Sequence, residues 1–255
     1  MPDTTTGLRH IEHVMGTVFS FDIRDEPTPA IRHALAAAVR QLHRVDAVFS
    51  TYRPDSHISR LDRGEIHLAD CPPEVREVMS LCAQAAHVSE GWFSVVPAGS
   101  LDPSGLVKGW AAEAASHVLY EAGAQRTCVN GGGDLQLRGR PTPGSAWRVG
   151  IAHPLRPGEL LTVVSAPHDL AVATSGTGER GNHIFNPHTG APADSFASLT
   201  LIGPRLTLTD TYATAAFARG EGAREWLETL DGYEALAVLP DGREWRTRGF
   251  GRHEA

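Results

Sequence analysis

The feature that most constrains the fold is a series of short strand-like segments that follow one another without a helix between them. Five such segments lie between residues 126 and 173, at 126–129, 135–138, 147–152, 160–164 and 170–173. A doubly wound parallel sheet needs helices that alternate with its strands, and this region lacks that alternation. The sequence therefore predicts an α+β fold.

Helix-like segments flank this region. In residues 30–49, apolar side chains recur at steps of three and four residues, which predicts a helix with one buried face. Further helices are expected from Pro73 onward, over 106–122 with Gly123 at the end, over 208–218 and over 221–230. Strands are expected over 14–23, 198–202, 235–239 and 244–248, and a polar loop over 50–64.

The composition is that of an ordinary globular protein. Of the 255 residues, 41% are hydrophobic and 21% are charged, which excludes general disorder. The length permits one large domain or two small ones, and we expect a single domain over residues 1–255. The formal net charge of -7 gives no general attraction to nucleic acid, so a phosphate site would have to be local. Cys71, Cys82 and Cys128 match neither a disulfide framework nor a zinc site, and we expect buried free thiols.

The sequence shows no sign of export or of membrane insertion. The first residues lack the charged and apolar regions of a secretory signal. No apolar run approaches the ~20 residues of a membrane span. We therefore expect a cytoplasmic protein without a membrane anchor.

A glycine-containing loop runs into the helix expected at 106–122. It contains Asp102, Ser104, Gly105 and Lys108. The start of a helix offers unpaired N–H groups and a partial positive charge, and Lys108 would add a full charge, so the loop suits a phosphate. A plain helix cap at Ser104 with a solvated Lys108 explains the same residues. Both interpretations stay open at this point.

Two further segments are rich in glycine. Residues 130–134 read Asn-Gly-Gly-Gly-Asp, and three glycines exceed what a two-residue hairpin turn requires, which favours a turn that faces a ligand over a plain hairpin. Residues 176–181 match GxGxxG literally. Because Pro187 follows so soon, this segment cannot open the long helix of a dinucleotide-binding fingerprint.

Two pairs of polar residues could carry chemistry. Asp210 and Thr214 are four residues apart in an expected helix, so both project from one face, and their oxygens suit Mg²⁺. On spacing alone, a helix cap at Asp210 and a back-bonded hydroxyl at Thr214 are the simpler explanation. His183 follows Thr174 and Ser175 in a loop where contacts to an anion are expected.

Seven short motifs occur in one order along residues 11–220, and together they resemble the ApbE family of FAD:protein FMN transferases. They are Met15-Gly16-Thr17, residues 50–61 with Tyr52, the loop from Asp102 to Gly109, residues 130–134, residues 173–176, residues 183–192, and Thr209-Asp210 with Ala213-Thr214. The resemblance implies an α+β fold, related to the T-fold, in which a mixed sheet flanked by helices binds FAD in an elongated cleft.

The same resemblance implies roles for individual residues. Asp210 and Thr214 would bind Mg²⁺ on the pyrophosphate of FAD, with a backbone carbonyl near Gly105 as a third ligand. The FAD-binding residues that it implies are Met15, Tyr52, Ser104, Lys108, Asn130, Gly131, Gly132, Asp134, Thr174, Ser175 and His183. Because both motifs occur in the family's order, the simpler explanations of the glycine turn and of Asp210 and Thr214 are no longer favoured.

The reaction that the resemblance implies is attack by a threonine hydroxyl of a client protein on the FMN-side phosphorus of FAD, with release of AMP. Asp210 and Lys108 would serve this step, and His183 is our hypothesis for the base. Two alternatives remain: hydrolysis of FAD to FMN and AMP at the same site, and flavin binding without turnover. His57 and Ser94 depart from the family's usual residues, which bears on local loop structure and not on the metal site.

Overall fold

A large antiparallel sheet organises the molecule. The structure is a computed structural model that describes residues 7–97, 99–176 and 184–255. Its strands are β1 (Leu8–Val14), β2 (Thr17–Ile23), β3 (Thr127–Gly131), β4 (Asp134–Arg138), β5 (Trp147–Ala152), β6 (Leu160–Ala166), β7 (Leu170–Gly176), β8 (Ser198–Gly203), β9 (Glu234–Val238) and β10 (Glu244–Arg246). Eight of them form one sheet in the order β1-β2-β3-β4-β7-β8-β9-β10, and every neighbouring pair is antiparallel. The remaining two pair with each other as the hairpin β5-β6.

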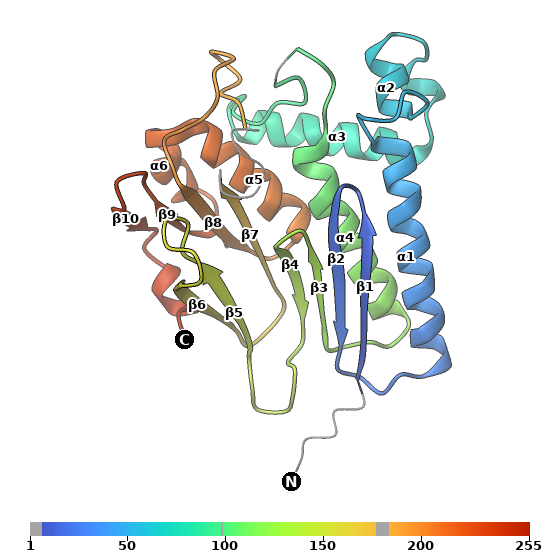
Figure 1. Cartoon of the computed structure of the whole chain (residues 1–255), viewed down its shortest axis with the longest axis vertical. Coiled ribbons are helices and arrows are strands. Elements are labelled where there is room, and N and C mark those ends of the chain that lie inside the picture. Colours follow the sequence, from blue (N-terminus) through green and yellow to red (C-terminus); the bar gives the residue numbers. More distant parts are fainter. Residues whose placement is uncertain (1–6, 98, 177–183) are drawn as a thin grey trace.

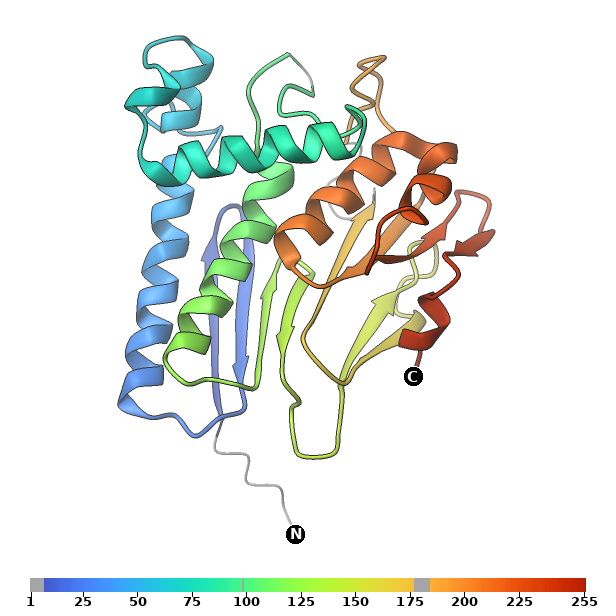
Figure 2. The same cartoon turned by 180° about the vertical axis from the view of Figure 1, so that it is seen from behind.

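The two faces of the large sheet are covered differently. The helices are α1 (Pro29–Phe49), α2 (His57–Asp62), α3 (Pro73–Val88), α4 (Ser104–Glu121), α5 (Leu206–Arg219) and α6 (Ala223–Leu227), with short 3₁₀ turns at Leu68–Asp70, Gly220–Gly222 and Phe250–His253. Figure 2 shows α1, α4 and α5 across one face. The hairpin β5-β6 lies on the opposite face (Figure 1).

The local sequence explains how the first long helix forms. The Thr28 hydroxyl accepts a hydrogen bond of 3.2 Å from the Ile31 backbone amide, and Pro29 occupies the first turn. The stripe predicted from the sequence is buried, from Ile31 through Leu42 to Phe49. This stripe holds α1 against the helix layer and the sheet.

Two apolar cores result from this arrangement. The larger lies between the helices and the sheet and includes the fully buried Phe19, Leu42 and Leu106. The smaller lies between the sheet and the hairpin and is built around Trp147 and Val172. Truncation of a fully buried leucine such as Leu42 to alanine is expected to cost about 2–5 kcal/mol. The cavity described below takes lining residues from both cores.

The predicted α+β class is confirmed, and most of the elements are found within a few residues of their expected bounds. Two expectations were wrong. Each pairing in the large sheet is antiparallel where a mixed sheet was expected. The polar loop expected over 50–64 contains α2, whose Ser56 hydroxyl accepts from the Ser59 amide at 3.1 Å.

The edge strand β1 was also missed, and its burial explains why. The side chains of His10 and Glu12 face the interior, whereas Ile11 on the opposite face is 64% exposed. Glu12 accepts hydrogen bonds from His10 and from His43 of α1. Polar contacts between strand and helix thus replace the apolar alternation by which a strand is recognised.

The cysteines agree with the expectation of free thiols. Cys71 and Cys82 are buried free thiols, Cys128 is a partly buried one, and burial raises the pKa of Cys82 to about 12. Among the described residues no helix is both long and apolar enough to cross a membrane.

Candidate functional site

A cavity of about 500 Å³ opens at one end of the large sheet. Its polar part is lined by the first turns of α4, by the turn between β3 and β4, and by α5. Its apolar part is lined by Leu135, Val149, Ile151 and Val172, which come from the sheet and from the hairpin. The cavity therefore reaches both layers of the molecule, and it can hold a ligand with one charged part and one apolar part.

An ion triad of Lys108, Asp134 and Asp210 occupies the polar part. Lys108 of α4 donates from Nζ to Oδ2 of Asp210 on α5 at 2.8 Å and to Oδ2 of Asp134 at the start of β4. The side chains of Asp134 and Asp210 are only 6% and 8% exposed. Three elements that are far apart in sequence thus meet at one buried cation.

The electrostatics of the triad are unbalanced. The pKa of Asp210 is raised to about 6: burial raises it most, Lys108 lowers it, and the charge of Asp134 raises it. Burial alone would lower the pKa of Lys108, but the two carboxylates outweigh it and raise that pKa above its ordinary value. With all three groups ionised, the triad carries one net negative charge. A further cation would relieve it.

Asp134 also has a structural task. Its Oδ1 accepts a hydrogen bond of 2.8 Å from the Thr174 backbone amide on β7, and the Thr174 hydroxyl lies 2.9 Å from the Thr200 hydroxyl on β8. The carboxylate of Asp134 thus fixes the end of β4 to its neighbour in the sheet. Lys108 is held from the sheet side by a group that is itself immobilised.

Two glycines let α4 approach α5 closely. A Cβ on Gly109 would lie 2.8 Å from the Leu206 carbonyl oxygen and 2.9 Å from Asp210 Cβ, so only glycine fits there without a shift. A Cβ on Gly105 would lie 3.5 Å from Thr214 Cγ2 and 3.8 Å from its Oγ1. The first turn of α4 therefore lies directly beside the hydroxyl of Thr214.

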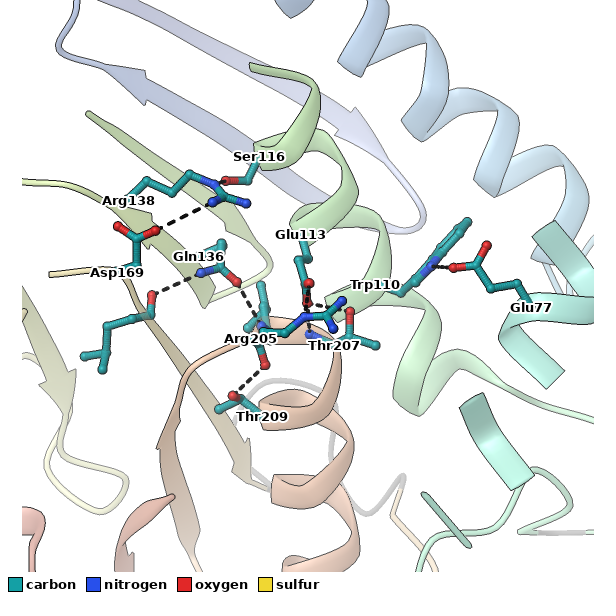
Figure 3. Close-up of polar contacts among 12 residues, drawn as sticks. Glu77, Trp110, Glu113, Ser116, Gln136, Arg138, Asp169, Arg205, Thr207 and Thr209 are labelled. Atoms are coloured by element: carbon teal, nitrogen blue, oxygen red, sulfur yellow. Dashed lines mark hydrogen bonds and ion pairs between the residues drawn. The ribbon is translucent and has the colours of Figure 1, made fainter. Parts of the chain in front are cut away.

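The amino terminus of α5 is held by residues of α4 and β4 (Figure 3). No side chain of its own caps this helix. Instead Glu113 accepts from the Thr207 amide at 2.9 Å and from the Thr207 hydroxyl at 2.7 Å, and its other oxygen accepts from Arg205 Nε at 2.6 Å. Gln136, which is buried, accepts from the Leu206 amide at 2.9 Å. These contacts set the position of the helix that carries Asp210 and Thr214.

Most of the residues singled out from the sequence line this one cavity. They are Ser104, Gly105, Lys108, Gly132, Asp134, Thr174, Ser175, Asp210 and Thr214. Ser104 is the first residue of α4 and does not cap it; its backbone amide donates to Oδ1 of Asp102 at 2.9 Å. Lys108 is not a solvated residue of a helix cap, because both of its partners are buried carboxylates.

The glycine motif forms a hairpin turn that faces the cavity. Gly132 and Gly133 both have positive φ, at 62° and 97°, and both line the cavity. Asn130 does not line it; its Oδ1 accepts from the Gly133 amide at 2.8 Å and so holds the turn. Gly131 is absent from the lining as well, because it faces Phe19, whose ring would be 2.8 Å from a Cβ. The motif is therefore both a hairpin turn and a turn that faces the cavity, so the two interpretations considered from the sequence describe the same turn.

Besides Asn130 and Gly131, two further predicted residues do not line the cavity, and one cannot be placed. Met15, with φ of 57°, is at the turn between β1 and β2, partly buried against the larger core. Tyr52 follows α1 and is 96% exposed. Its neighbour Thr51 lines a second hollow of about 430 Å³, which shares Asp102 with the main cavity. His183 lies outside the described residues, as does most of the GxGxxG match.

The hairpin β5-β6 supplies lining residues that the sequence did not reveal. Val149, Ile151 and His153 come from β5 and the position that follows it. Alternation along 147–152 predicts that one face of this strand is buried, but nothing in it shows that the face meets the cavity. Ile184 and Phe185 were not singled out either, although they follow His183 in sequence.

The polar part of the cavity provides hard oxygen donors. Asp210 contributes a carboxylate, Thr214 a hydroxyl, and Gly105 a carbonyl in the adjacent turn, a chemistry that suits Mg²⁺. Among the described residues no three His, Cys, Asp or Glu side chains converge on a point that could hold a metal ion. The predicted set contains a single carboxylate, so this finding does not test it.

Comparison with known proteins places these features in context. A family model described as "ApbE family" matches residues 15–99 and 94–237. Curated relatives named FAD:protein FMN transferase include one from Vibrio cholerae, 30% identical over 49% of this chain and 40% of the relative. Another from Treponema pallidum is 30% identical over 59% and 46%, and one from Rhodobacter capsulatus is 33% identical over 70% and 38%. In each case the chain spans less than half of the relative's length.

Solved structures show the same fold over nearly the whole chain. The flavin transferase ApbE of Vibrio cholerae superposes with a TM-score of 0.81 at 21% identity, covering 97% of this chain and 99% of the other. An ApbE protein of Thermotoga maritima gives 0.87 at 20% identity, covering 98% and 99%. At this level of identity the likeness concerns the fold alone.

Proposed function

The chain belongs to the ApbE family, and on that premise we propose that it transfers the FMN half of FAD to a hydroxyl of a client protein, with release of AMP. The observation that carries the proposal is the buried triad of Lys108, Asp134 and Asp210 at the polar part of a two-layer cavity. A buried, charged group beside an apolar chamber matches a substrate that joins a pyrophosphate to flat rings.

The cavity is suited to FAD in its two parts. The first turn of α4, with Ser104 and Gly105 on the cavity wall, directs the positive end of a helix dipole toward it. Lys108 adds a full positive charge within the same part. We place the pyrophosphate there and a ring system against the apolar wall formed by Val149 and Ile151.

We propose that Asp210, Thr214 and the Gly105 carbonyl hold Mg²⁺ beside the pyrophosphate. The two side chains face the same cavity, and Gly105 lies next to Thr214. The net negative charge of the triad favours a divalent cation at this position. When bound, Mg²⁺ would neutralise the pyrophosphate and stabilise the charge that develops on the departing AMP.

The chemical step is a substitution at phosphorus. The oxygen of the client hydroxyl, which we propose belongs to a threonine, forms a bond to the FMN-side phosphorus, and the bond from that phosphorus to the AMP oxygen breaks. AMP leaves with the electron pair, and the hydroxyl proton passes to a base. Lys108 stays protonated throughout because its pKa is raised, so it acts by charge and not by proton transfer.

His183 is our proposal for the base, on the argument of its place in the sequence motif and because histidine is the side chain that most often serves as a general base near neutral pH. Replacement of His183 by glutamine should lower turnover most strongly at neutral pH while FAD still binds. Near-normal turnover of that variant across the pH range would remove His183 from this role.

Chromatographic measurement of FAD, FMN and AMP tests the proposed reaction. With Mg²⁺ and a client that carries an acceptor threonine, AMP should accumulate while free FMN does not, and Asp210→Ala should abolish AMP release. Equal accumulation of free FMN and AMP would favour the hydrolase alternative. Intact FAD after prolonged incubation, with client and Mg²⁺ present, would favour a flavin-binding protein without turnover.

A further inference from the structure

His153 projects into the cavity from the hairpin layer. It directly follows β5, in which Trp147, Val149 and Ile151 are buried and their neighbours are exposed. His153 continues this alternation, since it is buried, with 8% exposure, and lines the cavity beside Ile151. An irregularity in the strand register at Ile151 and Ala152 lies just before it. Such bulges commonly redirect a side chain.

The backbone around His153 holds the imidazole in one state. Nδ1 accepts a hydrogen bond of 3.1 Å from the Leu155 backbone amide, while the His153 amide donates to the Glu159 carbonyl at 2.9 Å. Because Nδ1 accepts, the proton of the neutral ring resides on Nε2. His153 therefore presents an N–H donor at the end of its ring.

This donor has apolar neighbours. Val149 and Ile151 line the cavity on the same face of β5, and Val172 lines it from the sheet. Among the described residues no group accepts a hydrogen bond from Nε2 of His153. A ligand that displaces water from this donor loses free energy unless it supplies an acceptor, so the donor discriminates against ligands that lack one.

We propose that His153 recognises the heteroaromatic ring bound at the apolar part of the cavity, by donating from Nε2 to an acceptor on the rim of that ring. This inference rests on FAD being the substrate. Both halves of FAD carry such acceptors, carbonyl oxygens and ring nitrogens on the isoalloxazine and ring nitrogens on adenine. The chemistry is common to both, and binding of the separate halves distinguishes them.

Two substitutions separate the two roles of His153, donation from Nε2 into the cavity and acceptance by Nδ1 from the Leu155 amide. In His153→Asn, the amide oxygen can still accept from the Leu155 amide, as asparagine does in Asx turns, but the chain is too short to present a donor to the cavity. In His153→Gln, the longer side chain can place an N–H near the position of Nε2 but gives up the loop contact. Thermal unfolding of both variants reports the loop contribution independently of the ligand.

Calorimetric titration with FAD, with FMN and with AMP gives the test. His153→Asn should bind FAD about three- to tenfold more weakly than the wild type, the loss expected for one hydrogen bond, and His153→Gln should recover most of it. The loss should appear with FMN or with AMP but not with both, which identifies the ring.

Unchanged affinity of His153→Asn for FAD, FMN and AMP would overturn the proposal, and so would equal weakening by both variants. If the wild type binds FAD tightly and both variants bind it with the same affinity, the proposed role of His153 is wrong but the proposed function is not affected. If the wild type binds neither FAD nor its halves, the proposed function fails with it.

Discussion

Lys108 balances two buried carboxylates with a single charge. A pair of carboxylates at one cation leaves a net negative site, and burial, with the charge of Asp134 added to it, raises the pKa of Asp210 to about 6 against the opposing charge of Lys108. The folded protein therefore holds a proton at Asp210 more firmly than the unfolded chain does. Such a site lowers the stability of the folded protein when no ligand is bound, and a bound cation would restore that stability. Loss of stability at a functional site is common in proteins.

The sign of the pH effect follows from that shift. Since the folded pKa lies above the ordinary value of 3.8, ionisation of Asp210 destabilises the metal-free fold as pH rises from about 4 through 6. In urea unfolding at pH 8 with EDTA, Asp210→Asn should therefore have a free energy of unfolding higher than that of the wild type by on the order of 2 kcal/mol. This difference should shrink toward pH 4. Asp55→Asn, at an exposed position, is the control. A variant less stable than the wild type at pH 8 would contradict this account.

Helix α5, which carries the proposed metal ligands Asp210 and Thr214, has its position set by residues outside it. Its first amides donate to Glu113 of α4 and Gln136 of β4 (Figure 3). Its residues Leu206 and Asp210 pack against Gly109 of α4. Asp210 and Thr214 on α5, and Gly105 and Lys108 on α4, are thereby brought into one place. The geometry of the site is a property of this helix pair, not of any one side chain.

Close packing of the pair predicts different outcomes at its two glycines. Alanine raises helix propensity by about 1 kcal/mol at either position, so a difference between the variants reports steric contact. Gly109→Ala should be the less stable by about 1–3 kcal/mol, because its Cβ would lie 2.8 Å from a backbone oxygen, whereas the nearest neighbour at Gly105 is a ring atom of Phe93 at 3.2 Å. Urea unfolding measures both. Equal stability would mean that α4 and α5 lie farther apart than described.

The anchor at the start of α5 gives a second prediction for this pair. Glu113→Ala removes the acceptor of the Thr207 amide and should cost about 1–2 kcal/mol of unfolding free energy, comparable to loss of a helix cap. It should also weaken Mg²⁺ binding, since Asp210 is less firmly placed. Glu121→Ala, at an exposed position near the end of the same helix, is the matched control. If Glu113→Ala behaves like Glu121→Ala in both measurements, the anchor does not position the site.

Over the whole molecule, the cavity exists because two layers meet at the end of one sheet. The sequence predicted the helix-side residues of the cavity, because glycine, aspartate and lysine form recognisable motifs in a known order. It did not predict the wall from β5, since apolar alternation in a strand says which face is buried but not what the face meets. Strand β1 was not predicted for a related reason. Its inward face carries His10 and Glu12, and their partner His43 can be identified only once α1 has been placed beside the strand.

The measurement that tests the central claim most directly is the intact mass of a client protein with an acceptor threonine, after incubation with this protein, FAD and Mg²⁺. The account predicts a mass gain equal to one FMN. The gain should be lost when the client threonine is replaced by alanine, and also when Asp210→Ala replaces the wild type. A client of unchanged mass, in a reaction where FAD is consumed to FMN and AMP, would contradict the transferase and leave a hydrolase in its place.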